Sequence, residues 1–233
     1  MTPERYRRLL QALQYRQPDL TVITDEVHKG RNISAIVRTC DAVGIDTIHC
    51  VVPGSGYRGY RGTASGSHKW VNVELHSQLD GAIQTAKAQS MQVVAAALSE
   101  HSCSYLDIDY TKPTAILVGA EKFGISEAGL ASANVHVSVP MVGLVESLNV
   151  SVAVAIILQE VLRQRMQVGM YGANQLPAEV QKLRFFQWAH PKVAAYCDER
   201  NLDYPEINPD DGEIIDPSEW YRRVRESGID QKG

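Results

Sequence analysis

The sequence predicts an α/β fold in which helices cover both faces of a mostly parallel β-sheet. Between residues 20 and 168, segments with the apolar pattern of strands alternate with segments of helical periodicity. Two of the expected strands, 91–98 and 114–118, are apolar runs, which is typical of strands buried on both faces of a parallel sheet. The 233 residues, 44% of them hydrophobic, suffice for one such domain with short terminal extensions.

Each expected element has a local signal. Thr2 and Pro3 can start a helix that Pro18 ends, and Gly44 stops a helix that starts at Asn32. Elsewhere, short β-branched or apolar segments predict strands, whereas apolar residues at helical spacing predict helices. The expected strands are 20–23, 47–52, 70–75, 91–98, 114–118 and 135–139, and the expected helices are 2–15, 32–44, 79–89, 126–131 and 148–167.

The chain is expected to have three parts. Residues 1–19 form an N-terminal helical extension, and residues 20–168 form the α/β domain. From Gly169 onward, five prolines interrupt charged helical pieces. Residues 169–233 are therefore expected to be a C-terminal helical extension and not a second full domain.

Charge is distributed unevenly along the chain, whose net charge is −4. Residues 198–219 contain nine acids and one arginine, a net charge of −8, which leaves +4 for the rest. Residues 1–16 hold four arginines against one acid, and residues 47–73 hold basic side chains with no acid. These two regions are either ordinary solvated surface or basic patches that follow a phosphate backbone.

Several classes of protein are disfavoured. No apolar run approaches the roughly 20 residues of a membrane helix, and the N-terminus lacks an apolar signal core, so a cytoplasmic location is expected. No C-x-x-C pair occurs, which favours reduced thiols and disfavours a zinc site. The cysteines are Cys40, Cys50, Cys103 and Cys197.

A glycine-rich segment imitates a cofactor motif. Residues 54–59, GSGYRG, match the dinucleotide-binding pattern G-x-G-x-x-G directly after a strand, and Glu74 lies near the end of the next strand. The residues after Gly59 contain further glycines and no apolar stripe, so the required helix is missing. The P-loop pattern G-x-x-x-x-G-K-[ST] is absent as well. Nicotinamide-dependent and P-loop enzymes are therefore disfavoured.

Three segments far apart in the sequence place polar side chains where the predicted sheet meets its loops. Residues 32–44 carry Asn32, a plausible N-cap, and Arg38. Residues 116–125 place Glu121 after a buried strand, at the sheet edge where open α/β folds bind ligands. Residues 139–151 leave a strand through Pro and Gly and enter the long helix with Ser147 and Asn149. Each side chain alone is equally explained as a helix cap or turn former.

Together and in this order, the three segments resemble the SPOUT methyltransferases, specifically the branch that methylates ribose 2′-hydroxyls. The resemblance covers residues 20–168, and the two extensions are similar to those of enzymes that act on guanosine 18 of transfer RNA. It implies a deep C-terminal trefoil knot, S-adenosyl-L-methionine as cofactor, transfer RNA as substrate and a homodimer. The alternatives are ribosomal RNA, another position in transfer RNA, or RNA binding without chemistry.

The resemblance also implies roles for particular residues. The catalytic site would consist of Arg38, Asn32, Glu121, Ser147 and Asn149. The cofactor contacts would come from Ala96, Leu98, Gly119, Val139 and Leu148. Family members often have a hydroxylated residue at the position of Ala96, where this chain can offer only its backbone. Phosphate contacts are expected from Arg5, Arg8, Arg58, Arg61, Lys69, Arg163 and Arg165.

The implied reaction needs help in removing the hydroxyl proton and in aligning oxygen, methyl group and sulfur. The family assigns this activation to Arg38, yet a guanidinium with a pKa above about 12 is a poor general base. Arg38 either grips the neighbouring phosphate bidentately and stabilises the developing alkoxide, or accepts the proton in a strongly perturbed site. The first account is favoured, and neither requires a metal.

Overall fold

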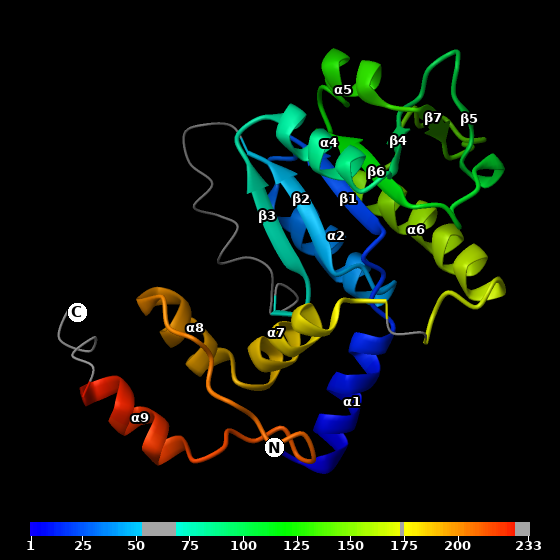
Figure 1. Ribbon diagram of the computed structural model, residues 1–233. Helices are drawn as coiled ribbons and strands as arrows, with labels where there is room; N and C mark the ends of the chain where they lie inside the picture. Colours follow the sequence, from blue (N-terminus) through cyan, green and yellow to red (C-terminus); the bar gives the residue numbers. More distant parts are fainter. Residues whose placement is uncertain (53–68, 173–174, 227–233) are drawn as a thin grey trace. The chain divides into compact units, whose positions relative to one another are not determined.

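The computed structural model describes residues 1–52, 69–172 and 175–226 (Figure 1). It divides into two units. The larger is Tyr15–Gln175, and the smaller combines Met1–Gln14 with Leu176–Gly233. The two terminal extensions therefore pack with each other.

A seven-stranded sheet forms the centre of the larger unit, with the order β3-β2-β1-β6-β4-β7-β5. All its pairings are parallel, as the sequence predicts. Because the strands are parallel, their carboxyl ends and the loops that follow lie at one edge. The strands are β1 Leu20–Asp25, β2 Thr47–Val51, β3 Asn72–His76, β4 Gln92–Ala96, β5 Cys103–Ser104, β6 Thr114–Gly119 and β7 Val135–Ser138.

Helices cover both faces of this sheet (Figure 1). Helices α2 (Gly30–Ala42) and α6 (Val150–Gln167) pack on one face, and α4 (Leu79–Ala88) and α5 (Glu127–Ser132) on the other. Side chains alternate along each strand, so that the four strands β2, β1, β6 and β4 contribute to both layers. Val22, Val94 and Ile116 face α2 and α6, whereas Ile23, Val93 and Leu117 face α4. The larger unit therefore has two hydrophobic layers, one on each face of the sheet.

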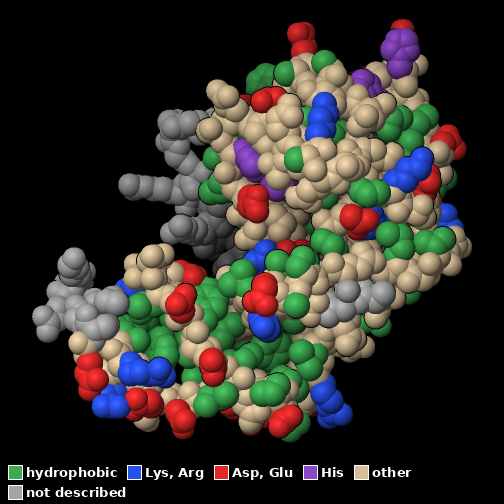
Figure 2. All heavy atoms as spheres, viewed as in Figure 1, with side chains coloured by type: hydrophobic (Ala, Val, Ile, Leu, Met, Phe, Trp, Pro, Cys, Tyr) green, Lys and Arg blue, Asp and Glu red, His purple; other side chains and the backbone are tan. Residues whose placement is uncertain are grey.

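The smaller unit is helical in the part that the structure describes. Its helices are α1 (Pro3–Gln14), α7 (Ala178–Ala189), α8 (Pro191–Arg200) and α9 (Pro217–Glu226). Tyr6 of α1 packs edge-on against Phe185 of α7, with ring centroids 5.4 Å apart. Acidic and basic side chains are interspersed around α9, where Arg222 pairs with Glu219 and Glu226 (Figure 2). None of the described helices combines the length and the apolarity needed to cross a membrane.

The structure differs from the predicted elements mainly at their ends. Asn32 does not cap α2, because the helix begins at residue 30 with Lys29 as its N-cap. Helix α6 begins two residues later than expected because Asn149 occupies its N-cap. Strand β5 and the 3-10 helix η2 (Tyr105–Asp107) were not predicted, since elements of two or three residues are too short to show a period.

Candidate active site

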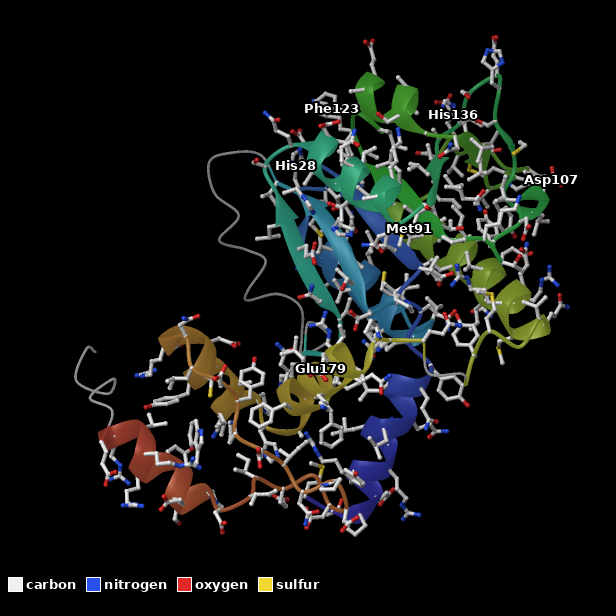
Figure 3. All side chains as sticks on the ribbon, viewed as in Figure 1. His28, Met91, Asp107, Phe123, His136 and Glu179 are labelled. Atoms are coloured by element: carbon white, nitrogen blue, oxygen red, sulfur yellow. The ribbon has the colours of Figure 1, made fainter. Side chains whose placement is uncertain are left out.

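Glu121 is the centre of a hydrogen-bonded group at the carboxyl edge of the sheet. Its Oε1 accepts hydrogen bonds from Asn32 Nδ2 at 2.7 Å and from Asn149 Nδ2 at 2.8 Å. Its Oε2 forms an ion pair with Lys29. We call these four residues the Glu121 cluster; they come from the start of α2, the loop after β6 and the start of α6. His28 and Phe123 mark the loops after β1 and β6, which lie at the same end of the sheet (Figure 3).

The carboxyl group of Glu121 is held in its ionised form. Hydrogen bonding from Lys29, and then from Asn32, lowers the pKa of Glu121 from its ordinary value of 4.5. At neutral pH it therefore accepts hydrogen bonds from its three neighbours and has no proton to donate. This makes it a positioning group for the amides of Asn32 and Asn149.

Asn149 connects this cluster to a helix. Its Oδ1 accepts from the backbone N–H of Ser151 at 2.9 Å and from the Ser151 hydroxyl at 2.6 Å, which caps α6. Its Nδ2 donates to Glu121 and lies 3.2 Å from Asn32 Oδ1. Both ends of one amide are thus used, so the first turn of α6 is tied to the sheet edge.

A pocket adjoins the cluster along the chain. Ser147 and Leu148 line it, and the next residue, Asn149, belongs to the cluster. The lining is apolar except for Ser138, Glu146 and Ser147. The lining residues come from the ends of β4 and β7, the segment that follows β7, and α6: Ala96, Ala97, Leu98, Val137, Ser138, Val139, Met141, Glu146, Ser147, Leu148, Ala153 and Ile157.

The pocket brings together most of the residues that the sequence predicts as cofactor contacts. Ala96, Leu98, Val139 and Leu148 all line it. Gly119 does not line the pocket, and packing explains why a glycine is needed at this position. A Cβ there would lie 2.0 Å from the backbone carbon of Gly124, so a larger residue would push the loop that carries Glu121 away.

Arg38 and Ser147 make no hydrogen bond or ion pair with the Glu121 cluster. Arg38 is exposed on α2, and within the described residues its guanidinium has no hydrogen-bond or ion-pair partner. It is therefore free to receive a ligand. Lys29 is the residue of this site that the sequence did not single out. No local pattern marks it, because its partner Glu121 is 92 positions away.

One of the expected RNA contacts is wrong. Arg165 is fully buried, and its guanidinium donates to the carbonyl oxygen of Tyr110 at 3.0 Å and to Asp19 Oδ1 at 2.5 Å. A buried and fully bonded side chain cannot contact phosphate. Arg163, two positions earlier, is exposed but pairs with Glu160 at 2.6 Å.

The other expected RNA contacts fall into two groups. Arg5, Arg8 and Lys69 are exposed. Arg5 Nη2 also lies 3.4 Å from the carbonyl oxygen of Trp188. Arg58 and Arg61 lie outside the described residues, so their role stays a prediction.

Comparison with known families matches the segment that carries this site. Residues 19–159 match the SpoU rRNA Methylase family, a stretch that contains the whole Glu121 cluster and every residue that lines the pocket. The chain belongs to this family. Residues 163–217 also match the C-terminal region of SpoU rRNA methylases, so the SpoU likeness continues into the smaller unit. The resemblance to ribose methyltransferases drawn from the sequence is confirmed.

Individual SpoU proteins are similar over most of their length. A tRNA (guanosine(18)-2'-O)-methyltransferase from Escherichia coli K12 is 43% identical over 98% of this chain and 100% of its own. The crystal structure of the Aquifex aeolicus TrmH/SpoU tRNA modifying enzyme superposes with a TM-score of 0.74 at 41% identity, covering 82% of this chain and 97% of that one. The methyltransferase AviRb from Streptomyces viridochromogenes, in complex with AdoMet, superposes with a TM-score of 0.58 at 26% identity, covering 64% and 59%.

Proposed function

We propose that this SpoU protein transfers the methyl group of S-adenosylmethionine to the ribose 2′-hydroxyl of guanosine 18 in transfer RNA. The observation that carries the proposal is the 43% identity to a tRNA (guanosine(18)-2'-O)-methyltransferase over 98% of the chain. The match includes both terminal extensions as well as the site. The Glu121 cluster beside a pocket supports chemistry at this edge, because binding alone would not need so many fixed polar groups.

The pocket suits the cofactor. Apolar walls from Leu98, Val139 and Leu148 can hold an aromatic base, and Glu146 and Ser147 offer polar groups for hydrogen bonding. Where the family often has a hydroxyl, Ala96 contributes backbone only. AviRb, a SpoU relative, is known in complex with AdoMet. When bound, S-adenosylmethionine supplies a methyl group on a sulfonium, ready for displacement by an oxygen nucleophile.

Arg38 activates the ribose hydroxyl in this proposal. Its guanidinium is free within the described structure, so it can grip a phosphate bidentately and stabilise the alkoxide that develops during transfer. The second account, in which Arg38 accepts the proton itself, requires loss of a proton whose pKa is normally above about 12. The Glu121 cluster positions the ribose and the start of α6, and Ser147 offers its hydroxyl from the wall of the pocket.

The proposal includes a homodimer. Exposed apolar side chains gather beside the pocket and at the start of α6, and burial against a second copy removes them from water. They are Leu98, Val142, Leu144, Val145 and Val152. Sedimentation should show a dimer at micromolar concentration, and Leu144→Asp should shift it toward monomer. Leu106→Asp, an equally apolar exposed position on η2, should leave the dimer intact. A monomeric wild type would contradict this part.

The deep trefoil knot and a cytoplasmic location also belong to the proposal. A knot after Val139 would bring the segment that lines the pocket back against the sheet edge, which is where residues 146–149 lie.

Methylation of defined transcripts tests the function. We expect unmodified transfer RNA to accept one methyl group from labelled S-adenosylmethionine, and ribose-methylation mapping to place it at guanosine 18. A matched transcript with 2′-deoxyguanosine at that position should accept none, because the nucleophile is missing. If methylation persists on the deoxy transcript, or is found on ribosomal RNA instead, the enzyme methylates a position other than guanosine 18.

A further inference from the structure

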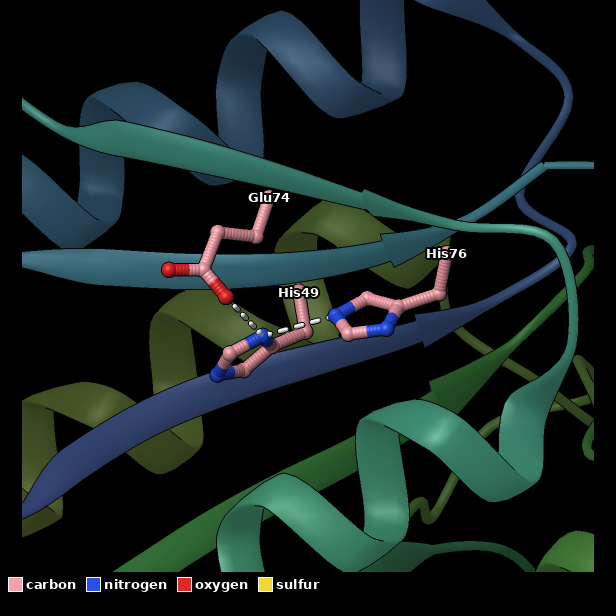
Figure 4. A group of neighbouring side chains, drawn as sticks. All are labelled: His49, Glu74 and His76. Atoms are coloured by element: carbon pink, nitrogen blue, oxygen red, sulfur yellow. Dashed lines mark hydrogen bonds and ion pairs between the residues drawn. The ribbon is translucent and has the colours of Figure 1, made fainter.

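His49, Glu74 and His76 form a compact group on strands β2 and β3 (Figure 4). Strands β2 and β3 are paired so that His49 lies opposite Glu74, and His76 follows two positions later on the same face. This is the face that α4 covers. Strands β1 and β6 separate β2 from the strands β4 and β7, which line the pocket. The group is therefore distinct from the proposed active site.

The nitrogen and oxygen atoms of the three side chains converge. His49 Nδ1 lies 3.0 Å from His76 Nε2 and 3.3 Å from Glu74 Oε2, and all three atoms lie within 4.8 Å of one another. Ligands about 2.0–2.1 Å from a tetrahedral zinc ion are roughly 3.3–3.4 Å apart. The two measured separations are close to this spacing. An ion could therefore be held with small movements of side chains.

Hydrogen bonding engages one nitrogen of His49 with two neighbours. His49 Nδ1 faces both Glu74 Oε2 and His76 Nε2; which histidine donates to the other depends on the tautomers, and a single hydrogen on Nδ1 cannot point at both partners. A cation between the three atoms interacts with all of them at once. Two neutral imidazoles and one carboxylate are a ligand set used by zinc sites with an open fourth position.

The surroundings hold these side chains in place. His49 is 4% exposed and lies on β2, which has a neighbouring strand on each side. Asn72 Nδ2 donates to Glu74 Oε1 at 3.3 Å, which leaves Oε2 to face the histidines. Such outer hydrogen bonds orient metal ligands in known sites. Strand pairing has thus already fixed most of the geometry that binding would require.

We propose that His49, Glu74 and His76 bind one divalent transition-metal ion, with zinc the best match to the ligands. The sequence predicts no metal site because it offers no cysteine motif, and the three ligands meet only through the register of β2 and β3. The ion would fasten the edge strand β3 to the sheet. It plays no part in methyl transfer as proposed above.

Metal titration of the untagged, chelator-treated full-length protein tests the site. Zinc in competition with a chromophoric chelator should bind at one ion per chain, and cobalt should give the visible absorption of a tetrahedral site. Glu74→Gln and His76→Ala should each weaken zinc affinity on the order of 100-fold. Both residues lie on the edge strand, so these variants are expected to fold, which circular dichroism checks.

The matched control is His101→Ala, which removes an exposed histidine from the segment after β4. It should bind zinc as the wild type does. Substoichiometric binding by the wild type would overturn the proposal, and so would equal affinity in the Glu74→Gln and His76→Ala variants. In that case the three side chains form a hydrogen-bonded group without an ion.

Discussion

Glu121 shows at the scale of single residues how one side chain organises a site. Its carboxylate accepts hydrogen bonds from Asn32 and Asn149 through the same oxygen and pairs with Lys29 through the other. Three chain segments therefore depend on one ionised group. Arg38 has the opposite character, since no described residue engages its guanidinium. In the proposed mechanism the Glu121 cluster holds the geometry of the site, and the guanidinium of Arg38 contacts the substrate.

Arg38 can be tested by two substitutions. Arg38→Ala should fold and bind S-adenosylmethionine normally, because the side chain is exposed, but its single-turnover rate should fall on the order of 10²–10⁴-fold. Arg38→Lys should restore little of the rate, since a point charge cannot form a bidentate clamp. Calorimetry with the cofactor and rapid-quench methylation measure the two quantities. Turnover near the wild-type rate in Arg38→Ala would remove this residue from the mechanism.

The lowered pKa of Glu121 predicts the pH response of the cluster. A carboxyl group whose pKa is lowered on folding stabilises the folded protein at pH values above its ordinary pKa, which is 4.5 for Glu121. This stabilisation is lost as the pH falls through the lowered pKa. Glu121→Gln should therefore reduce kcat by a constant factor between about pH 5 and 8. The test is the ratio of the two pH profiles. A ratio that changes near pH 6 or 7 would show that Glu121 titrates there and is not simply an ionised acceptor.

At the scale of elements, α6 is anchored at both ends. Asn149 caps its first turn and joins it to the Glu121 cluster. Near its last turn, Arg165 reaches the residues that precede β1 and β6, donating to Asp19 and to the carbonyl oxygen of Lys112. The helix therefore connects the proposed site to the opposite edge of the sheet. Its middle packs against α2 and β6 through the core.

The buried anchor of α6 predicts a stability difference between neighbouring arginines. Arg165→Met should lower the free energy of unfolding by about 3 kcal/mol, since Asp19 and several carbonyl oxygens lose a buried partner. Arg163→Ala is the control on the same turn. The side chain of Arg163 is 53% exposed, and Glu160, although buried, keeps a hydrogen bond from Gln164 Nε2, so the loss should be the smaller of the two, about 1 kcal/mol. Urea denaturation measures both. Equal losses in the free energy of unfolding would mean that the burial of Arg165 does not make it more important for stability than Arg163.

For the whole molecule, the distribution of charge matters more than the net value of −4. The acidic stretch 198–219 lies in the smaller unit, where α9 supplies arginines that pair with part of it, as Arg222 does with Glu219. Exposed basic side chains of α1, such as Arg8, belong to the same unit. We propose that such exposed basic side chains outside the acidic stretch contact the phosphate backbone.

Salt dependence tests which basic residues follow the RNA. Each phosphate contact removed should reduce the slope of log affinity against log salt by roughly one unit or somewhat less. Arg58→Ala with Arg61→Ala should therefore flatten the slope for transfer RNA without changing the methylated nucleotide. Arg222→Ala should leave the slope unchanged because that side chain is occupied by acids. Identical slopes for the double variant and wild type would exclude Arg58 and Arg61 from the RNA contacts.

The sequence by itself determined the fold class and the family. Strand and helix patterns depend on neighbours within a few positions. The alternation of strands and helices along the chain, and from it a parallel sheet, could therefore be predicted from the sequence, and both are confirmed. The polar residues at strand ends were visible for the same reason. Helix ends were less certain, because a cap such as Asn149 is recognised only by the hydrogen bonds it makes.

Only the tertiary structure decided which side chains meet and which are buried. Arg163 and Arg165 look alike in sequence, but they are about 200° apart around a helix, and only packing shows which one faces the core. Lys29 finds Glu121, and His49 finds Glu74, through strand order and register. Such contacts join positions from 25 to 92 residues apart. No local period encodes them, because they exist only once the sheet has assembled.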